Sequence, residues 1–186
     1  MPANPSKVKY GLHNVYYATK SSSTTTPYNT PVAIPGAVSI SMEPQGELAK
    51  FYADNGVYWQ SSSNNGYEGD LEMAKFPASF LQAIFGESAG TNGVVAEYDN
   101  IQPVEFALLF EFSGDADHTR YALYNCIATR PTIASQTTNE TIEPQTETMT
   151  ISAVPGSDHI VKGYVEQTGT AYANWFTSVT KPSSNG

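Results

Sequence analysis

The stretch Glu105-Phe106-Ala107-Leu108-Leu109-Phe110-Glu111-Phe112 is the most apolar strand-like part of this chain. A strand with one face in solvent would alternate apolar and polar residues, but here five consecutive positions are apolar. Continuous apolar runs of this length are typical of strands covered on both faces. We therefore predict a central strand over 104–112 whose two faces are both buried.

A short helix is predicted upstream of this strand. Pro77 suits the first turn of a helix, where its missing N–H would have no partner. Four apolar residues follow at helical spacing, and Gly86 is placed to end the helix; these apolar residues are Phe80, Leu81, Ile84 and Phe85. We expect this helix to cover one face of the central strand.

The rest of the chain is typical of short strands separated by turn residues. Residues 37–42 alternate apolar and polar side chains before Pro44 and Gly46 interrupt the pattern, and Asn-Gly pairs at Asn55 and Asn65 indicate tight turns. A meander of three strands is expected between 48 and 75. The predicted strands lie at 8–18, 37–42, 48–53, 57–60, 67–75, 94–97, 104–112, 119–129 and 160–166, with a Thr-rich stretch over 142–154 and a docked helical turn around Trp175, Phe176 and Val179.

Length and composition predict a single domain. The chain has 186 residues, of which 40% are apolar, enough for one sizeable core. We expect a mobile N-terminal arm at 1–6 and a mobile tail at 181–186. The N-terminus lacks the apolar core of a signal peptide, and no stretch reaches the length of a membrane span. Synthesis in a reducing cytoplasm, without export and without a membrane role, is the resulting expectation.

Charge and cysteine content narrow the function further. The net charge is −9, from 18 acidic and 9 basic residues, and Lys and Arg form no run. Direct binding to nucleic-acid phosphates is therefore not expected. Cys126 is the single cysteine, so it cannot form an internal disulfide, and its apolar neighbours predict a small buried hydrophobe.

No active site is predicted. Gly86-Glu87-Ser88-Ala89-Gly90 matches the nucleophile elbow of α/β-hydrolases, but an elbow needs a strand before the serine and a helix after it, whereas here a helix precedes. The histidines His13, His118 and His159 are far apart and accompany no cysteine pair, so no metal site is expected. We expect no enzyme activity, no metal and no cofactor.

Several blocks of sequence, in this order, resemble the major tail protein family of siphovirus-type bacteriophages. They span nearly the whole chain, and their order carries the resemblance more than any one of them. They are Lys9-Tyr10-Gly11-Leu12-His13-Asn14-Val15-Tyr16-Tyr17-Ala18, Phe51-Tyr52-Ala53-Asp54-Asn55-Gly56, Ser61-Ser62-Ser63-Asn64-Asn65-Gly66-Tyr67-Glu68-Gly69-Asp70-Leu71-Glu72, Glu105-Phe106-Ala107-Leu108-Leu109-Phe110-Glu111-Phe112, Tyr124-Asn125-Cys126-Ile127-Ala128-Thr129-Arg130-Pro131 and Glu143-Pro144-Gln145-Thr146-Glu147-Thr148.

The resemblance implies a mainly β tail tube fold: an antiparallel β-sandwich or half-barrel with one short flanking helix, assembled as stacked hexameric rings. The implied function is structural, in the tail of a virion, as the tube through which DNA passes during ejection. The implied partners are further copies of the chain and the tape measure, tail terminator and distal tail proteins. DNA would pass through the lumen without specific binding.

Candidate contact residues follow from exposed aromatics and loops. Adjacent aromatic residues in a strand put one ring on each face, which makes the pairs Tyr16-Tyr17 and Tyr58-Trp59 candidates for contact with a partner subunit. The full set of candidate inter-subunit or inter-ring residues is Tyr16, Tyr17, Glu43, Phe51, Tyr52, Asp54, Tyr58 and Trp59. Candidate lumen acids, which would repel phosphates, are Glu68, Asp70 and Glu72.

Two alternatives predict different behaviour. A carbohydrate-binding β-sandwich of a phage receptor apparatus would use exposed Tyr and Trp rings and would act as a monomer. A small hydrolase would depend on Ser88.

Overall fold

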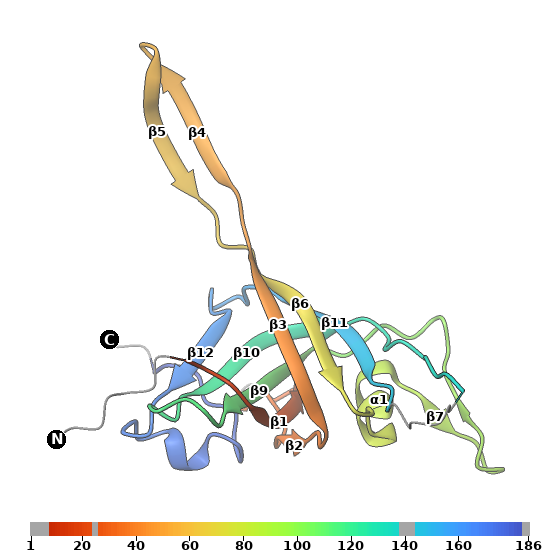
Figure 1. The fold of residues 1–186 in the computed structure, drawn as a ribbon. Helices are drawn as coiled ribbons and strands as arrows, with labels where there is room; N and C mark the ends of the chain where they lie inside the picture. The colour runs from red at the N-terminus through yellow and green to blue at the C-terminus, as the bar shows by residue number, and fades with distance from the viewer. Residues whose placement is uncertain (1–7, 24–25, 138–143, 184–186) are drawn as a thin grey trace.

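The computed structural model describes residues 8–23, 26–137 and 144–183. One antiparallel sheet forms the body, in the strand order β2-β1-β9-β10-β11-β6-β3, with β12 paired to the first half of β10 (Figure 1). The bounds are β1 (Leu12–Thr19), β2 (Val32–Ala33), β3 (Ala37–Gln45), β6 (Gly66–Met73), β9 (Phe106–Phe112), β10 (Arg120–Ala128), β11 (Glu147–Ala153) and β12 (Lys162–Val165). The predicted mainly β, antiparallel fold with one short flanking helix is confirmed.

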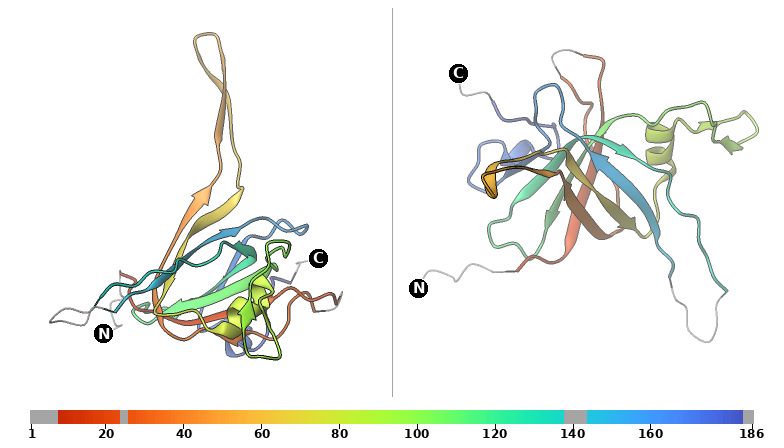
Figure 2. Two further views of the ribbon diagram at one scale, coloured as in Figure 1. Left: turned by 90° about the vertical axis from the view of Figure 1, so that its right-hand side faces the viewer. Right: turned by 90° about the horizontal axis from the view of Figure 1, so that it is seen from above.

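Strand β9 lies between two apolar cores, as its continuous apolar run predicts. Phe106, Leu108 and Phe110 join the larger core, around which the sheet curves (Figure 2), whereas Ala107 and Leu109 join a smaller core on the opposite face. All five side chains are buried. Removing this apolar surface from water on both sides makes β9 the centre of the fold.

Helix α1 (Ala78–Phe85) covers the larger core. Pro77 occupies its N-cap and Gly86 ends it with a φ of 67°, the left-handed conformation that favours glycine. The ring of Phe80 packs edge-on against that of Phe106, with 6.0 Å between centroids. The predicted helix and the face that it covers are both confirmed.

The C-terminal segment covers the smaller core. A short 3₁₀ helix, η1 (Tyr172–Asn174), precedes Trp175, whose ring is buried and whose Nε1 donates to the carbonyl oxygen of Tyr121 at 3.3 Å. The predicted docking of this helical turn is confirmed. Of the predicted mobile ends, residues 1–6 and 184–186 lie outside the described residues, and Lys181 makes an ion pair with Asp158.

The prediction for the region between residues 37 and 75 is wrong in two respects. Strand β3 does not end before Pro44 but runs to Gln45, because β3 is an edge strand, where a proline is tolerated. The expected three-stranded meander does not form either. Strand β6 pairs with β3 and β11, whereas β4 (Leu48–Ala53) and β5 (Gly56–Ser62) pair with each other.

The pairing registers of the two ladders explain this arrangement. Gln45 pairs with Gly66 at the end of the β3–β6 ladder, and Leu48 pairs with Ser62 at the start of the β4–β5 ladder. The second ladder therefore continues the ribbon that the first begins, and it leaves the body as a projecting hairpin (Figure 1). A smaller hairpin of β7 (Ser88–Ala89) and β8 (Val95–Ala96) follows α1.

Candidate functional site

The β4–β5 hairpin projects from the body in Figure 1 and in the left view of Figure 2. Its turn residues Asp54 and Asn55 have φ values of 52° and 62°, so both central positions are left-handed, as a tight two-residue hairpin turn requires. The predicted turn is confirmed.

The four aromatic candidate contact residues of this hairpin have their side chains in solvent, and the fifth candidate on it, Asp54, is also exposed. Phe51, Tyr52, Tyr58 and Trp59 are 58%, 63%, 73% and 55% exposed, respectively. The ring of Phe51 contacts that of Tyr58 edge-on, at 6.4 Å between centroids. Clustered apolar surface of this kind indicates an interaction site, because a ribbon of two strands cannot bury it internally.

The two candidates on β1 lie elsewhere. Tyr17 is only 5% exposed, and its ring packs edge-on against Phe80 in the larger core. Tyr16 points to the opposite face of the strand, where it is half-buried and stacks on Phe176 at 4.8 Å. The alternation of the pair is as predicted, but both rings already have partners within the chain.

The candidate lumen acids form a row on one face of β6. Glu68, Asp70 and Glu72 alternate with Leu71 and Met73, which are buried in the larger core, so the acids point away from that core. Glu43 of β3 is exposed and pairs directly with Glu68. Like charges opposite each other are destabilising, so the fold itself gains nothing from this pair.

Hydroxyl groups on β3, on β11 and just before β11 donate hydrogen bonds to two of these acids. Ser39 Oγ donates to Glu72 Oε2 at 2.8 Å, Thr146 Oγ1 donates to Glu72 Oε1 at 2.5 Å, and Thr150 Oγ1 donates to Asp70 Oδ1 at 2.8 Å. The hydrogen bonds from Thr146 and Ser39 lower the pKa of Glu72. These neutral donors therefore favour the ionised form of Glu72.

The ion pairs found among the described residues use other acids. Arg130 pairs with Glu97, Lys20 with Glu105, Arg120 and His13 with Glu111, and Lys181 with Asp158. The row of Glu43, Glu68, Asp70 and Glu72 consequently presents unneutralised negative charge to its surroundings.

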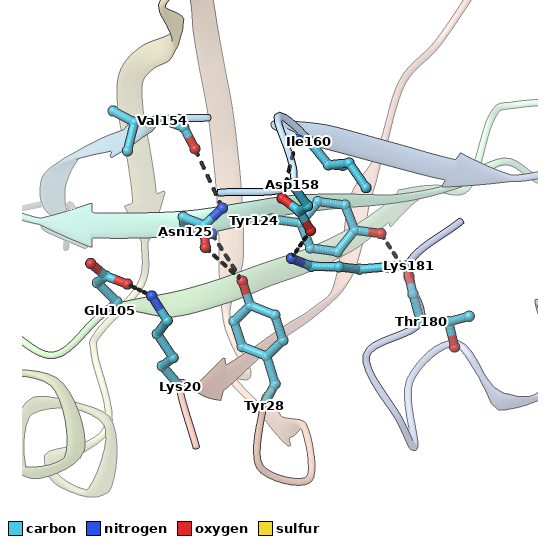
Figure 3. Close-up of polar contacts among 10 residues, drawn as sticks. All are labelled: Lys20, Tyr28, Glu105, Tyr124, Asn125, Val154, Asp158, Ile160, Thr180 and Lys181. Carbon is cyan, nitrogen blue, oxygen red and sulfur yellow. Dashed lines mark hydrogen bonds and ion pairs between the residues drawn. The ribbon is translucent and has the colours of Figure 1, made fainter. Parts of the chain in front are cut away.

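A polar cluster that the sequence did not predict holds the C-terminal segment against the sheet (Figure 3). Lys181 Nζ donates to Asp158 Oδ2 at 2.6 Å, and the ammonium lies 5.4 Å from the centroid of the Tyr124 ring. Tyr124 donates its hydroxyl to the carbonyl oxygen of Thr180 at 2.6 Å. Asn125, with a φ of 50°, marks a bulge in β10 and accepts a hydrogen bond from the hydroxyl of Tyr28 at 3.2 Å.

A second anchor lies at the other end of the C-terminal segment. Arg120 Nε donates to Glu111 Oε2 at 2.8 Å, and Arg120 Nη1 donates to the carbonyl oxygen of Tyr172 at 2.6 Å. The guanidinium carbon of Arg120 lies 3.7 Å from the centroid of the Tyr172 ring. The two anchors are structural, and together they fix the segment that covers the smaller core.

The Asp158–Lys181 pair predicts a mild acid sensitivity. The hydrogen bond from Lys181 lowers the pKa of Asp158 below its ordinary 3.8, so the pair stabilises the folded state above that pH and is lost as the pH falls through the lowered value. The exchange Lys181→Met should therefore cost under about 1 kcal/mol near neutral pH, and this difference should shrink below about pH 4. Thermal unfolding across pH measures it, with Lys50→Met on the hairpin as the control. A difference that stays constant down to low pH would contradict the assignment.

The catalytic and metal motifs weighed from the sequence lie in simple structural settings. Ser88 is the exposed first residue of β7, after helix α1 and not before one, so the elbow geometry is not formed there. The described residues contain no group of three His, Cys, Asp or Glu side chains that could hold a metal ion. Cys126 is fully buried, and burial raises the pKa of its thiol to about 12. No helix in the described ranges is long and apolar enough to cross a bilayer.

Comparison with known proteins gives likenesses of fold alone. No family model matches the chain, and no curated protein matches it. A chain of the sheath–tube complex of an extracellular contractile injection system is 8% identical, with a TM-score of 0.49, over 86% of this chain and 93% of that one. A chain of the tube-terminating cap of the anti-feeding prophage is 11% identical, with a TM-score of 0.49, over 89% and 98%. A chain of the baseplate of the same particle is 12% identical, with a TM-score of 0.48, over 91% and 99%.

Proposed function

We propose that this chain is a structural subunit that assembles with copies of itself into stacked hexameric rings, forming the tube of a phage tail or a related particle. The observation that carries the proposal is the projecting hairpin. An isolated two-stranded ribbon is marginally stable in water, and this one carries six large apolar side chains that are at least half exposed. These are Leu48, Phe51, Tyr52, Val57, Tyr58 and Trp59.

The placement of the hairpin favours open stacking over a closed dimer. The hairpin projects from one side of the body, whereas β2 and η1 lie on the opposite side (Figures 1 and 2). If the hairpin binds another part of the next copy, the contact is heterologous, and each copy still presents a free hairpin. Repetition of such a contact builds rings and stacks.

The acid row suits a conduit for DNA. Carboxylates on the wall of a bore repel phosphates, so DNA would pass without the counterion release that strengthens binding to basic surfaces. We propose that Glu68, Asp70 and Glu72 face the lumen, and that the tape measure, tail terminator and distal tail proteins are further partners. An assembled structure with a bore lined mainly by Lys and Arg would contradict this part of the proposal.

Sedimentation velocity of the purified chain tests self-assembly in solution. The expected result is a shift from monomer to large species as the concentration rises. A single monomeric species at every concentration, together with binding to glycans through the hairpin aromatics, would instead support the carbohydrate-binding alternative.

A further inference from the structure

The hairpin is apolar on both of its faces. Cross-strand partners share a face, and Phe51 pairs with Trp59, so these two rings lie together. Tyr58 is the extra residue of a bulge, and its ring contacts Phe51, which places it on the same face. We call this set of Phe51, Tyr58 and Trp59 the aromatic face.

The opposite face of the β4–β5 ribbon differs from the aromatic face in its charge. Tyr52 pairs with Val57, and Leu48 and Lys50 alternate with Phe51 along β4, so these four side chains share the other side. We call Leu48, Lys50, Tyr52 and Val57 the lysine face. The aromatic face carries no charged side chain, whereas the lysine face carries one cation.

One flat surface cannot cover both faces. Successive side chains of a strand point to opposite sides of the ribbon, so a partner that buries Trp59 leaves Tyr52 in water, and the reverse also holds. The side chains on both faces are about equally exposed. Full burial of the hairpin therefore requires a surface on each side of it.

Two of the exposed apolar patches on the body, one on the β7–β8 arm and one on β12, lie on opposite sides of it (Figures 1 and 2). The β7–β8 arm carries Val94, Val95 and Tyr98 beside the acidic residues Glu87 and Asp99. On the other side of the body, β12 carries Tyr164, which is 62% exposed, and Lys162, whose Nζ donates to the hydroxyl of Tyr67 at 3.1 Å. Because the two patches are far apart on one chain, one copy cannot present both to the same hairpin.

We propose that each hairpin is clamped between two other copies of this chain, with its lysine face on the β7–β8 arm of one copy and its aromatic face on β12 of another. Charge favours this pairing: Lys50 meets the acids Glu87 and Asp99, and the uncharged aromatic face meets the exposed ring of Tyr164. The hairpin then joins two neighbouring subunits at their seam. This inference rests on the proposed self-assembly and adds which surfaces of the neighbouring copies bind the hairpin.

Photo-crosslinking of the full chain tests the clamp. Ser61 lies on the aromatic face opposite Ala49, and Gln60 lies on the lysine face opposite Lys50; both are exposed. The variants Ser61→Cys, Gln60→Cys and the double variant are labelled with benzophenone maleimide, and each is assembled with an excess of unlabelled chain. Buried Cys126 remains unlabelled, and the wild-type chain taken through the same labelling is the control.

The expected result is distinct for each variant. Each single variant gives two-chain adducts only, and the double variant gains three-chain adducts on a denaturing gel. Peptide mapping places the Gln60→Cys adducts in the β7–β8 arm and the Ser61→Cys adducts in β12. Assemblies whose double variant yields two-chain adducts alone, or whose two labels map to one segment, would overturn the clamp. If the unlabelled chain forms no sedimenting assembly, the proposed function itself fails.

Discussion

Trp59→Ser is expected to abolish assembly while leaving the folded body intact. The Trp59 ring is a large apolar group on a hairpin that the body does not cover. The free energy of burying this ring is therefore gained only when the hairpin contacts another copy. Buried tryptophans at interface centres are worth about 2 kcal/mol or more, which is roughly a 30-fold loss of affinity per contact. Because every subunit of a stack repeats this contact, the loss is multiplied along the tube. Sedimentation of the variant beside wild type measures it.

A matched variant separates interface loss from unfolding. Val32→Ser removes an exposed apolar side chain from edge strand β2, away from the hairpin. It should assemble as wild type does, and both variants should unfold within about 0.5 kcal/mol of wild type, as exposed substitutions usually do. Normal assembly of Trp59→Ser, or a large fall in its unfolding free energy, would argue against the hairpin as the assembly element.

Phe106→Ala is expected to cost about 3 to 5 kcal/mol of folding stability, the usual range for deleting a buried aromatic ring. Phe106 begins the central strand, has no exposed surface, and packs against Phe80 of α1. The substitution would leave a cavity between the sheet and its covering helix. Denaturant unfolding measures the loss.

Ile133→Ala provides the control for this core variant. Its side chain is exposed, so its removal should change the unfolding free energy by less than about 0.5 kcal/mol. Equal effects of the two substitutions would contradict the assignment of β9 as the centre of the fold.

Local sequence signals were sufficient to predict several individual elements. The apolar run of β9 predicted a strand with two covered faces, and Pro77 and Gly86 predicted both ends of α1. Each signal depends on side chains within a few residues of one another. Because these signals are local, the predictions of β9 and α1 are confirmed. The tight turn at Asp54 and Asn55 is confirmed for the same reason.

Pairing between distant segments could not be predicted in the same way. Whether β6 pairs with β5 or returns to β3 depends on which partner completes the larger core, and no local pattern records that choice. The same limit applies to the rings of β1. Alternation predicted that Tyr16 and Tyr17 face opposite ways, but not that Phe176 and Phe80 would cover them.

The anchors of the C-terminal segment left no signal in the sequence. Tyr28, Tyr124, Asp158 and Lys181 are separated by 23 residues or more and share no motif spacing. They meet because a bulge in β10 and two loops converge there (Figure 3). By contrast, the acid row was visible as alternating Glu68, Asp70 and Glu72 because a strand places every second side chain on one face.

Electron microscopy of the purified full chain in negative stain tests the central claim, self-assembly into a tube, most directly. The account predicts rings with a central bore, stacked into tubes in the wild type and absent in Trp59→Ser. Dispersed monomers at every concentration of the wild-type chain would contradict it.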